Sequence, residues 1–423
     1  MDERFKAEAF VGDNDRVSAR VTVRDVLRVR EFRAVLASSG LSILGDQVAR
    51  IAVALLVFDR TGSEFAASAT YACSYLTWLV SGPLLSSLAD RQRRRRLMVR
   101  CDLLRAGLIA VLLVPGLPLW ILFAVLVLVG LLSPPFDAAK SALLPEILAG
   151  DLYVAGSAVQ SAVFQGAHVG GFLVGGTLVA FTSAQVALAV DVATFLVSAA
   201  LLGIWVAERP VTRVERPSLA RDTVAGVSLV AADPVLRRLL AYGVVGSLTM
   251  IVPEGLAVPV SERLGGGAMT AGVLTAAIPA GYLVGSFCLL RVPVERRPPL
   301  LPRLTLLACL PLLLTPVVGS TAAVVALWVL AGAACAVGLV ANAAFMVAVP
   351  SEVRGRAFGV AQTTLMAVQG VVLLAVGALA ELVTPLRAVG LAGAVILVPA
   401  LLLALRPQVR REGTTGAVPV GGA

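Results

Sequence analysis

The stretch Ser86-Ser87-Leu88-Ala89-Asp90-Arg91-Gln92-Arg93-Arg94-Arg95-Arg96 places one aspartate and five arginines at the end of an apolar run. A run of ~20 apolar residues is long enough to cross a bilayer as a helix. Arginine and lysine collect at the cytoplasmic ends of such helices. The stretch therefore predicts the cytoplasmic end of a membrane span, and it sets the direction of the segments before and after it.

The composition of the whole chain agrees with a membrane protein. The chain has 423 residues, of which 58% are hydrophobic and 14% are charged, with a mean hydropathy of +0.91. Soluble domains are about a quarter charged, so the composition excludes a water-soluble globule and a disordered chain. The net charge of +9 comes from arginines that lie between apolar runs, which indicates membrane topology and no nucleic-acid partner.

Apolar runs divide the chain into two similar halves, and we predict an all-α polytopic membrane protein with twelve transmembrane helices in two six-helix bundles. The predicted organisation is a cytoplasmic tail (1–33), a first bundle (34–206), a connector with an interfacial helix at 219–232 (207–237), a second bundle (238–406) and a cytoplasmic tail (407–423). The predicted spans are 34–58, 65–89, 97–114, 118–143, 153–181, 184–206, 238–260, 267–290, 304–319, 322–349, 357–383 and 386–405.

The distribution of basic residues predicts the orientation. With the N-terminus inside, the outer loops hold only Arg60, Arg263 and Arg387. Almost all other basic residues outside the spans then fall at the cytoplasmic ends, in agreement with the positive-inside rule. We expect a multi-pass protein of the cell membrane with both termini in the cytoplasm.

The opening stretch also resembles the loop between the second and third helices of the major facilitator superfamily. Asp90, Arg91, Arg94 and Arg95 match that family's pattern, whereas Ser86 and Arg93 replace glycines. The resemblance implies a gating loop whose aspartate links the two bundles. A helix N-terminus favours such an aspartate. The alternative is a loop whose arginines serve topology alone.

Four further motifs resemble one branch of that superfamily, the drug and natural-product exporters that include macrolide-efflux and enterobactin-exporter-like proteins. The matching segments are Ser42–Asp46, Phe136–Pro145, Asp233–Arg237 and Pro350–Gly359. The resemblance implies a secondary transporter in which two bundles rock around a central site.

Glycines recur in the fifth predicted helix. Gly166, Gly170 and Gly175 resemble the antiporter signature of the superfamily, with Gly171 in place of its proline. Small residues at this spacing also allow helices to approach closely, so the alternative is that these glycines serve packing alone.

Ionisable residues inside predicted spans are candidates for proton coupling or substrate binding, because charge is costly in a bilayer. They are Asp46, Arg50, Asp191, Glu254 and His168. Asp46 and Arg50 share a helix face, so they form either a neutralised packing pair or a proton or cation site. Glu254 has no basic neighbour in sequence. His168 is either a proton relay or a hydrogen-bonded packing residue.

These features predict a proton antiporter that exports a small amphipathic or cationic compound, such as a drug, an antibiotic or another natural product. We expect it to act as a monomer in the lipid bilayer, with a small-molecule substrate and protons as partners. The family pattern implies a cavity lined by the first, fourth, fifth, seventh, eighth, tenth and eleventh helices. The alternatives are a proton-coupled nutrient importer and a non-transporting scaffold. No enzymatic activity, metal or cofactor is expected, because no nucleophile–base set, phosphate loop or metal-ligand cluster is visible.

Overall fold

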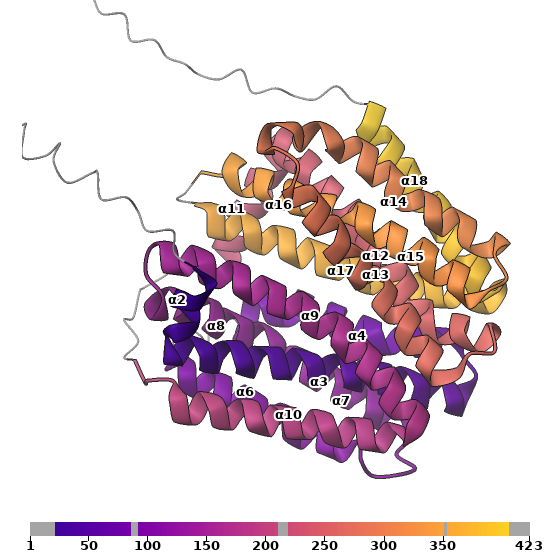
Figure 1. Cartoon of the computed structure of the whole chain (residues 1–423), viewed down its shortest axis with the longest axis horizontal. Helices are drawn as coiled ribbons and strands as arrows, with labels where there is room; N and C mark the ends of the chain where they lie inside the picture. The colour runs from indigo at the N-terminus through magenta and orange to yellow at the C-terminus, as the bar shows by residue number, and fades with distance from the viewer. Residues whose placement is uncertain (1–21, 86–91, 210–218, 351–352, 406–423) are drawn as a thin grey trace, which may run out of the picture.

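The computed structural model describes residues 22–85, 92–209, 219–350 and 353–405 and is all-helical within them (Figure 1). The N-terminal half contains α2 (Val23–Arg28), α3 (Arg30–Thr61), α4 (Glu64–Leu85), α6 (Arg94–Val111), α7 (Leu119–Leu131), α8 (Ser133–Ile147), α9 (Asp151–Phe181) and α10 (Ala184–Trp205).

Helix α11 (Leu219–Ala232) follows and coincides with the predicted interfacial helix of the connector. The C-terminal half contains α12 (Pro234–Arg263), α13 (Gly267–Leu290), η1 (Val294–Arg296), η2 (Pro298–Leu300), α14 (Leu301–Leu314), η3 (Thr315–Val317), α15 (Thr321–Cys335), α16 (Val337–Ala348), α17 (Arg354–Leu382) and α18 (Pro385–Leu405). The all-α membrane fold is therefore confirmed.

Ten helical segments of the described chain are long and apolar enough to cross a membrane. Three of them combine consecutive helices: α7 with α8, α15 with α16, and α14 with the short helices η1, η2 and η3. The two predicted spans outside this set correspond to α4 and α6. Helix α6 begins with the arginine run, which lowers its hydropathy, whereas α4 carries many serine, threonine and tyrosine residues. The count of twelve therefore stays a prediction.

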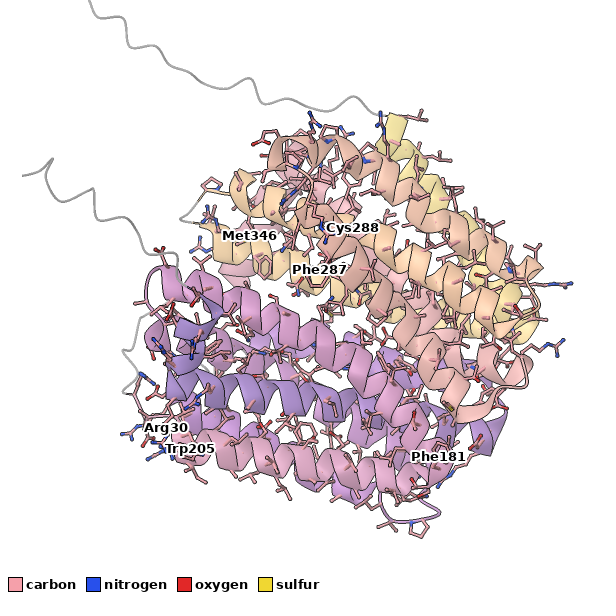
Figure 2. The ribbon with its side chains drawn as sticks, in the orientation of Figure 1. Arg30, Phe181, Trp205, Phe287, Cys288 and Met346 are labelled. Atoms are coloured by element: carbon pink, nitrogen blue, oxygen red, sulfur yellow. The ribbon has the colours of Figure 1, made fainter. Side chains whose placement is uncertain are left out.

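Most of the described basic residues lie at one end of the molecule, whereas Arg60, Arg263 and Arg387 lie at the other. We call the former the connector end, because α11 lies there beside the start of α17, where Gly226 touches the main chain of Arg356. At this end the guanidinium of Arg30 at the start of α3 lies 3.6 Å from the ring centre of Trp205 at the end of α10 (Figure 2). The other end, where α3 turns into α4, is called the opposite end.

Local sequence explains where several helices begin and end. The carboxylate of Asp233 accepts hydrogen bonds from the backbone N–H groups of Val235 (2.7 Å) and Leu236 (3.3 Å), and Pro234 occupies the first helical position of α12. An aspartate cap followed by proline is a favoured helix start. Gly62 ends α3 with φ +63°, a conformation that glycine adopts without steric strain.

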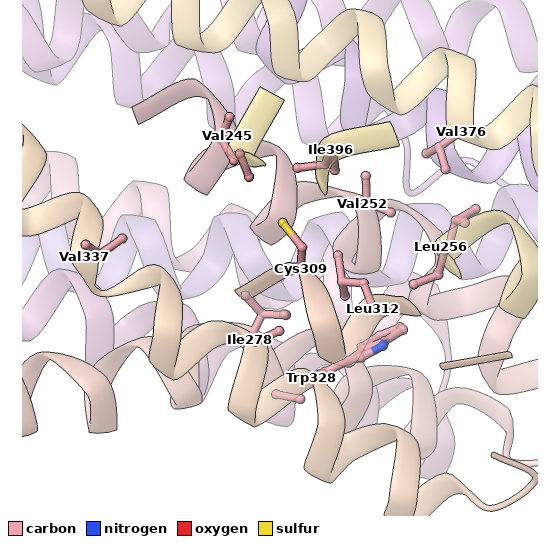
Figure 3. Close-up of a cluster of buried hydrophobic side chains, with 14 of the residues drawn as sticks. Val245, Val252, Leu256, Ile278, Cys309, Leu312, Trp328, Val337, Val376 and Ile396 are labelled. Atoms are coloured by element: carbon pink, nitrogen blue, oxygen red, sulfur yellow. The ribbon is translucent and has the colours of Figure 1, made fainter. Parts of the chain in front are cut away.

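The C-terminal half has its own apolar core. Trp328, Cys309, Leu312 and Val252 are fully buried between α12, α14 and α15 (Figure 3). The indole N–H of Trp328 donates to the hydroxyl of Thr315 at 3.3 Å, which satisfies its polar atom inside the core.

The two halves meet near the opposite end. In α4, the hydroxyl of Ser68 donates to the carbonyl of Leu373 in α17 at 2.7 Å. The carboxylate of Glu381 in α17 accepts from the hydroxyl of Ser63 and from the backbone N–H of Phe65. A second seam joins α9 to α13, visible in Figure 1, and these contacts hold the halves together away from the connector end.

The seam between α9 and α13 leads to a matched prediction. A Cβ on Gly176 would lie 2.6 Å from the Cα of Gly272, whereas a Cβ on Gly170 would meet nothing within 4 Å. We expect Gly176→Val to lower the free energy of unfolding by about 1–3 kcal/mol, as overpacking does. Gly170→Val carries the same intrinsic helix penalty and serves as control. Thermal unfolding in detergent compares them, and equal melting temperatures for the two variants would contradict the seam.

Candidate functional site

A cavity of about 410 Å³ lies between the two halves. All five ionisable residues predicted inside the spans line it, namely Asp46, Arg50, His168, Asp191 and Glu254. They come from α3, α9, α10 and α12, so the fold brings together groups that are up to about 200 residues apart in sequence. Its volume is in the range of sites that hold drug-sized molecules, about 300–1,000 Å³.

The helices around this cavity differ from the family-based expectation. Its lining includes Tyr71 of α4, Arg105 of α6 and Asp191 of α10, which correspond to the second, third and sixth predicted spans. Within the described chain, α15 and α16, the tenth span, contribute no lining residue. The expectation was wrong on these helices, because a cavity wall depends on which helices lean inward and sequence spacing does not encode that tilt.

An ion pair joins the two halves inside the cavity. Nη1 of Arg50 in α3 lies 3.7 Å from Oε1 of Glu254 in α12, and the two side chains are 26% and 17% exposed. The guanidinium of Arg50 also lies 5.5 Å from the ring centre of Tyr75 in α4. Of the two alternatives for Asp46 and Arg50, the neutralised packing pair is not found in the described structure, since Arg50 pairs with Glu254.

Asp46 and Asp191 both line the part of the cavity wall that the N-terminal half provides. A Cβ on Gly45 would collide with Oδ1 of Asp191 and with Oγ1 of Thr194. Gly45, which precedes Asp46, therefore lets α10 approach α3 closely, and Asp191 lies against this glycine. Asp191 is 1% exposed and accepts a hydrogen bond from Thr194 at 3.3 Å.

A buried network lies behind this wall. Nη1 of Arg105 is 3.9 Å from Oδ1 of Asp102, one helical turn away on α6. The hydroxyl of Ser198 donates to Asp102 at 2.5 Å and exchanges a hydrogen bond with Ser38 at 2.8 Å. The network links α6, α10 and α3.

Further cavity residues were not assigned to the site by sequence reasoning. Lys140, part of the family-like motif Phe136–Pro145, donates to Asp137 at 2.6 Å on α8 and lies 5.8 Å from the ring centre of Phe136. Tyr71 and Trp78 line the α4 side. Tyr71, Tyr75 and Trp78 recur at helical spacing in a segment otherwise rich in small residues, a signal that could have identified them.

His168 lines the cavity from α9. Its Nδ1 lies 3.2 Å from the carbonyl oxygen of Phe164. Because a carbonyl can only accept, Nδ1 is the donor and Nε2 remains for another partner. The ring also stacks against Phe164 with centroids 4.4 Å apart. This geometry matches the hydrogen-bonded packing residue and leaves the relay role as a prediction.

The gating-loop residues divide into two groups. Asp90 and Arg91 lie outside the described residues. Arg94 donates to Glu146 and to the carbonyl of Ala142 on α8, and Arg95 donates to the carbonyl of Gly203 on α10. Both contacts remain within the N-terminal half.

Glu208, just beyond α10, binds the neighbouring arginines of the same run. Its carboxylate contacts Arg93 at 3.0 Å and Arg96 at 3.1 Å. Partial loss of hydration would raise the pKa of Glu208, but the hydrogen bonds and positive charge of Arg93 and Arg96 outweigh it and lower this pKa. The arginine run therefore docks α6 against the end of α10.

The glycines of α9 do not all serve packing. A Cβ on Gly175 would collide with Ile51 and Val48 of α3, so Gly175 permits close contact there. Gly166 and Gly170 have nothing within 4 Å of their Cβ positions, so the packing alternative was wrong for them. Gly171 and Gly176 make the other close approaches, to α3 and α13.

Comparison with known proteins identifies the family. The chain matches the model of the Major Facilitator Superfamily over residues 35–292, which is more than half of its length. It is 26% identical to macrolide efflux protein A of Streptococcus pyogenes over 124 residues. That match covers 27% of this chain and only 31% of the relative.

Solved structures support the same fold. The nucleoside transporter NupG superimposes with a TM-score of 0.70 at 12% identity, covering 88% of this chain and 98% of that one. A POT family transporter in complex with a thioalcohol-conjugated peptide gives a TM-score of 0.69 at 13% identity, covering 88% and 95%. At these identities the likeness concerns the fold alone.

The buried Arg105–Asp102 pair generates a stability prediction. Arg105→Met leaves the carboxylate of Asp102, which is 0% exposed, without its counter-charge. Breaking one side of a buried pair costs about 3–5 kcal/mol. We expect the double variant Asp102→Asn with Arg105→Met to recover most of that loss, because no isolated charge remains. Thermal unfolding compares the two, and a double variant as unstable as the single one would contradict this account.

Proposed function

This chain belongs to the Major Facilitator Superfamily, and on that premise we propose that it is a secondary active transporter that exports a small amphipathic or cationic compound in exchange for protons. The cargo would be a drug, an antibiotic or another natural product. The proposed arrangement is a monomer in the cell membrane with both termini in the cytoplasm. The bundles 34–206 and 238–406 would rock against each other around the cavity.

The Arg50–Glu254 ion pair is the observation that carries this proposal. It spans from α3 to α12, so it is sensitive to how the two halves are arranged. At this separation the attraction is on the order of 4 kcal/mol in a partly hydrated site, before lost hydration is subtracted. Only the ionised carboxylate takes part, so a proton on Glu254 would release the link between the halves.

This chemistry fits the requirement for coupling. A proton shifts a conformational equilibrium only if it binds one state better than the other. In the present arrangement Arg50 competes with a proton for Glu254. A state in which α3 and α12 separate would lose the pair, and Glu254 would then be free to take a proton. Proton binding and bundle movement are linked by this pair.

Two observations favour export over import. The relative that matches in sequence is named as an efflux protein, although the match covers under a third of it. The cavity wall also carries the aromatic side chains Tyr71, Tyr75, Trp78, Phe136, Phe164 and Phe172, which suit an apolar cargo. The structural neighbours include a nucleoside transporter and a peptide-bound transporter, so import of a nutrient is the second candidate.

We expect Glu254→Gln to abolish efflux driven by a pH gradient while substrate exchange without a gradient continues. The amide cannot take up a proton, but the cavity keeps its shape. Inside-out vesicles loaded with a pH gradient and supplied with erythromycin, ethidium or tetraphenylphosphonium would measure both activities. Glu262→Gln, on an exposed site of the same helix, is the matched control. Intact gradient-driven efflux in Glu254→Gln would refute coupling through this residue.

The direction of transport has its own test. In cells that lack their own pumps, expression of this chain is expected to lower the accumulation of the same three compounds. Higher accumulation would instead support the importer. No flux of any compound, together with a stable protein complex, would support the scaffold.

A further inference from the structure

A stacked arginine–tryptophan pair lies at the connector end of the N-terminal half. The guanidinium of Arg30, at the start of α3, lies 3.6 Å from the ring centre of Trp205, at the end of α10. Figure 2 shows both side chains at the outer edge of the molecule. Arg30 is exposed and Trp205 is 38% exposed, so the pair belongs to the surface of the protein and not to its core.

The acidic side chains at this end are paired with other arginines. Glu208 binds two arginines of the run that begins α6, and Glu31 accepts from Arg209 at 2.6 Å. Among the described residues, no ion pair involves Arg30 or Arg33, which follows one turn later on α3. Two exposed positive charges of α3 therefore have no counter-charge in the described part of the protein.

The stacking leaves the hydrogen-bond donors of Arg30 accessible. The ring of Trp205 covers one face of the guanidinium, whereas the five N–H donors lie in the guanidinium plane. Arginine binds phosphate groups through two such donors at once. The tryptophan thus holds Arg30 in an orientation in which its edge can bind a phosphate.

More positive charge surrounds the same helix end. Arg95 of α6 donates through Nη2 to the carbonyl oxygen of Gly203, two residues before Trp205, and this contact leaves it further N–H donors. Arg33 is exposed and neighbours Arg30 on one face of α3. Three positive charges therefore lie at the connector ends of α3, α6 and α10.

An exposed apolar strip on α10 leads to this cluster. Ile204 is 72% exposed, and Val197, about two helical turns earlier, is 47% exposed. Exposed apolar side chains of a membrane span face lipid tails, which are as apolar as they are. Tryptophan prefers the level of the lipid headgroups, so Trp205 stands where the strip ends. A phospholipid has the same order of groups, with an acyl chain that leads to a charged headgroup.

We propose that Arg30, Arg33 and Trp205 form a binding site for an anionic phospholipid in the membrane leaflet at the connector end. The two guanidinium groups bind the anionic headgroup, and one acyl chain lies along Val197 and Ile204. Interfacial arginine and tryptophan anchors set the tilt and rotation of membrane helices, so the bound lipid fixes α3 and α10 relative to the bilayer. The site lies outside the cavity and is independent of the cargo and of the direction of transport.

Native mass spectrometry of the detergent-purified full chain tests this site without any flux. The probes are dioleoylphosphatidylglycerol, which is anionic, and dioleoylphosphatidylcholine, which is zwitterionic and has the same acyl chains. We expect the wild type to bind the anionic lipid about tenfold more tightly, and Arg30→Gln to lose about tenfold in that affinity with its charge-assisted hydrogen bonds. A wild type without preference between the two lipids would overturn the inference.

Arg237→Gln is the matched control for charge. It removes an exposed arginine at the connector end of the C-terminal half, and we expect the affinity for the anionic lipid to stay within about twofold of wild type. Arg30→Lys keeps the charge but loses the planar fork, so we expect a loss of about threefold. Equal losses in Arg30→Gln and Arg237→Gln, or wild-type affinity in Arg30→Lys, would overturn the inference, because general attraction to a basic surface would then suffice.

A free phosphate is the other source of the same anionic group. We expect an excess of inorganic phosphate to leave the bound phosphatidylglycerol in place, because phosphate cannot occupy the apolar strip. Ile204→Asn leaves all charges unchanged and is expected to weaken lipid binding about threefold, since it removes apolar surface. Displacement by phosphate, or lipid binding that Ile204→Asn does not affect, would overturn the lipid assignment. Equal melting temperatures of all variants without lipid would exclude a folding defect.

Discussion

The absence of water inside a bilayer is the constraint on which the rest of this structure depends. Backbone polar groups must find partners within the chain, which leaves the helix as the local solution for each crossing. Side-chain charges obey the same rule, and the described structure satisfies most of them in pairs. Two ion pairs form within single helices, Arg105 with Asp102 and Lys140 with Asp137. Arg50 with Glu254 needs two halves of the protein.

This difference between local and long-range pairs separates structure from function. A pair one turn apart on a helix persists however the halves move, so it stabilises the bundle. A pair between α3 and α12 depends on how the halves are arranged. Protonation of its carboxylate can therefore change the relative stability of different arrangements of the halves. The carboxyl groups that find neither kind of partner, Asp46 and Asp191, remain as acceptors in the cavity. We therefore expect function at charged groups whose ion pair depends on the arrangement of the halves, and at charged groups that have no ion pair.

Much of the fold could be predicted, and the reasons are physical. Apolar runs and Gly or Pro boundaries placed the helices within a few residues, and α11 lies where the connector helix was expected. Five ionisable residues of the cavity could also be predicted, because an ionisable residue inside an apolar run is costly unless it faces the bundle interior or a cavity. The sequence did not predict which ion-pair partner each of these residues has. Arg50 and Asp46 lie one turn apart, which made them the natural pair, yet Arg50 binds Glu254 about 200 residues away.

The sequence by itself determined that this is a helical membrane protein, where most of its positive charge lies, and which ionisable groups of the spans face the interior. These properties follow from composition and spacing along one dimension. Only the tertiary structure decided that Gly175 packs while Gly166 and Gly170 do not, and that Asp191 lies against Gly45. The reason is that such contacts depend on helix tilt and rotation, which neighbouring helices impose and local sequence does not specify.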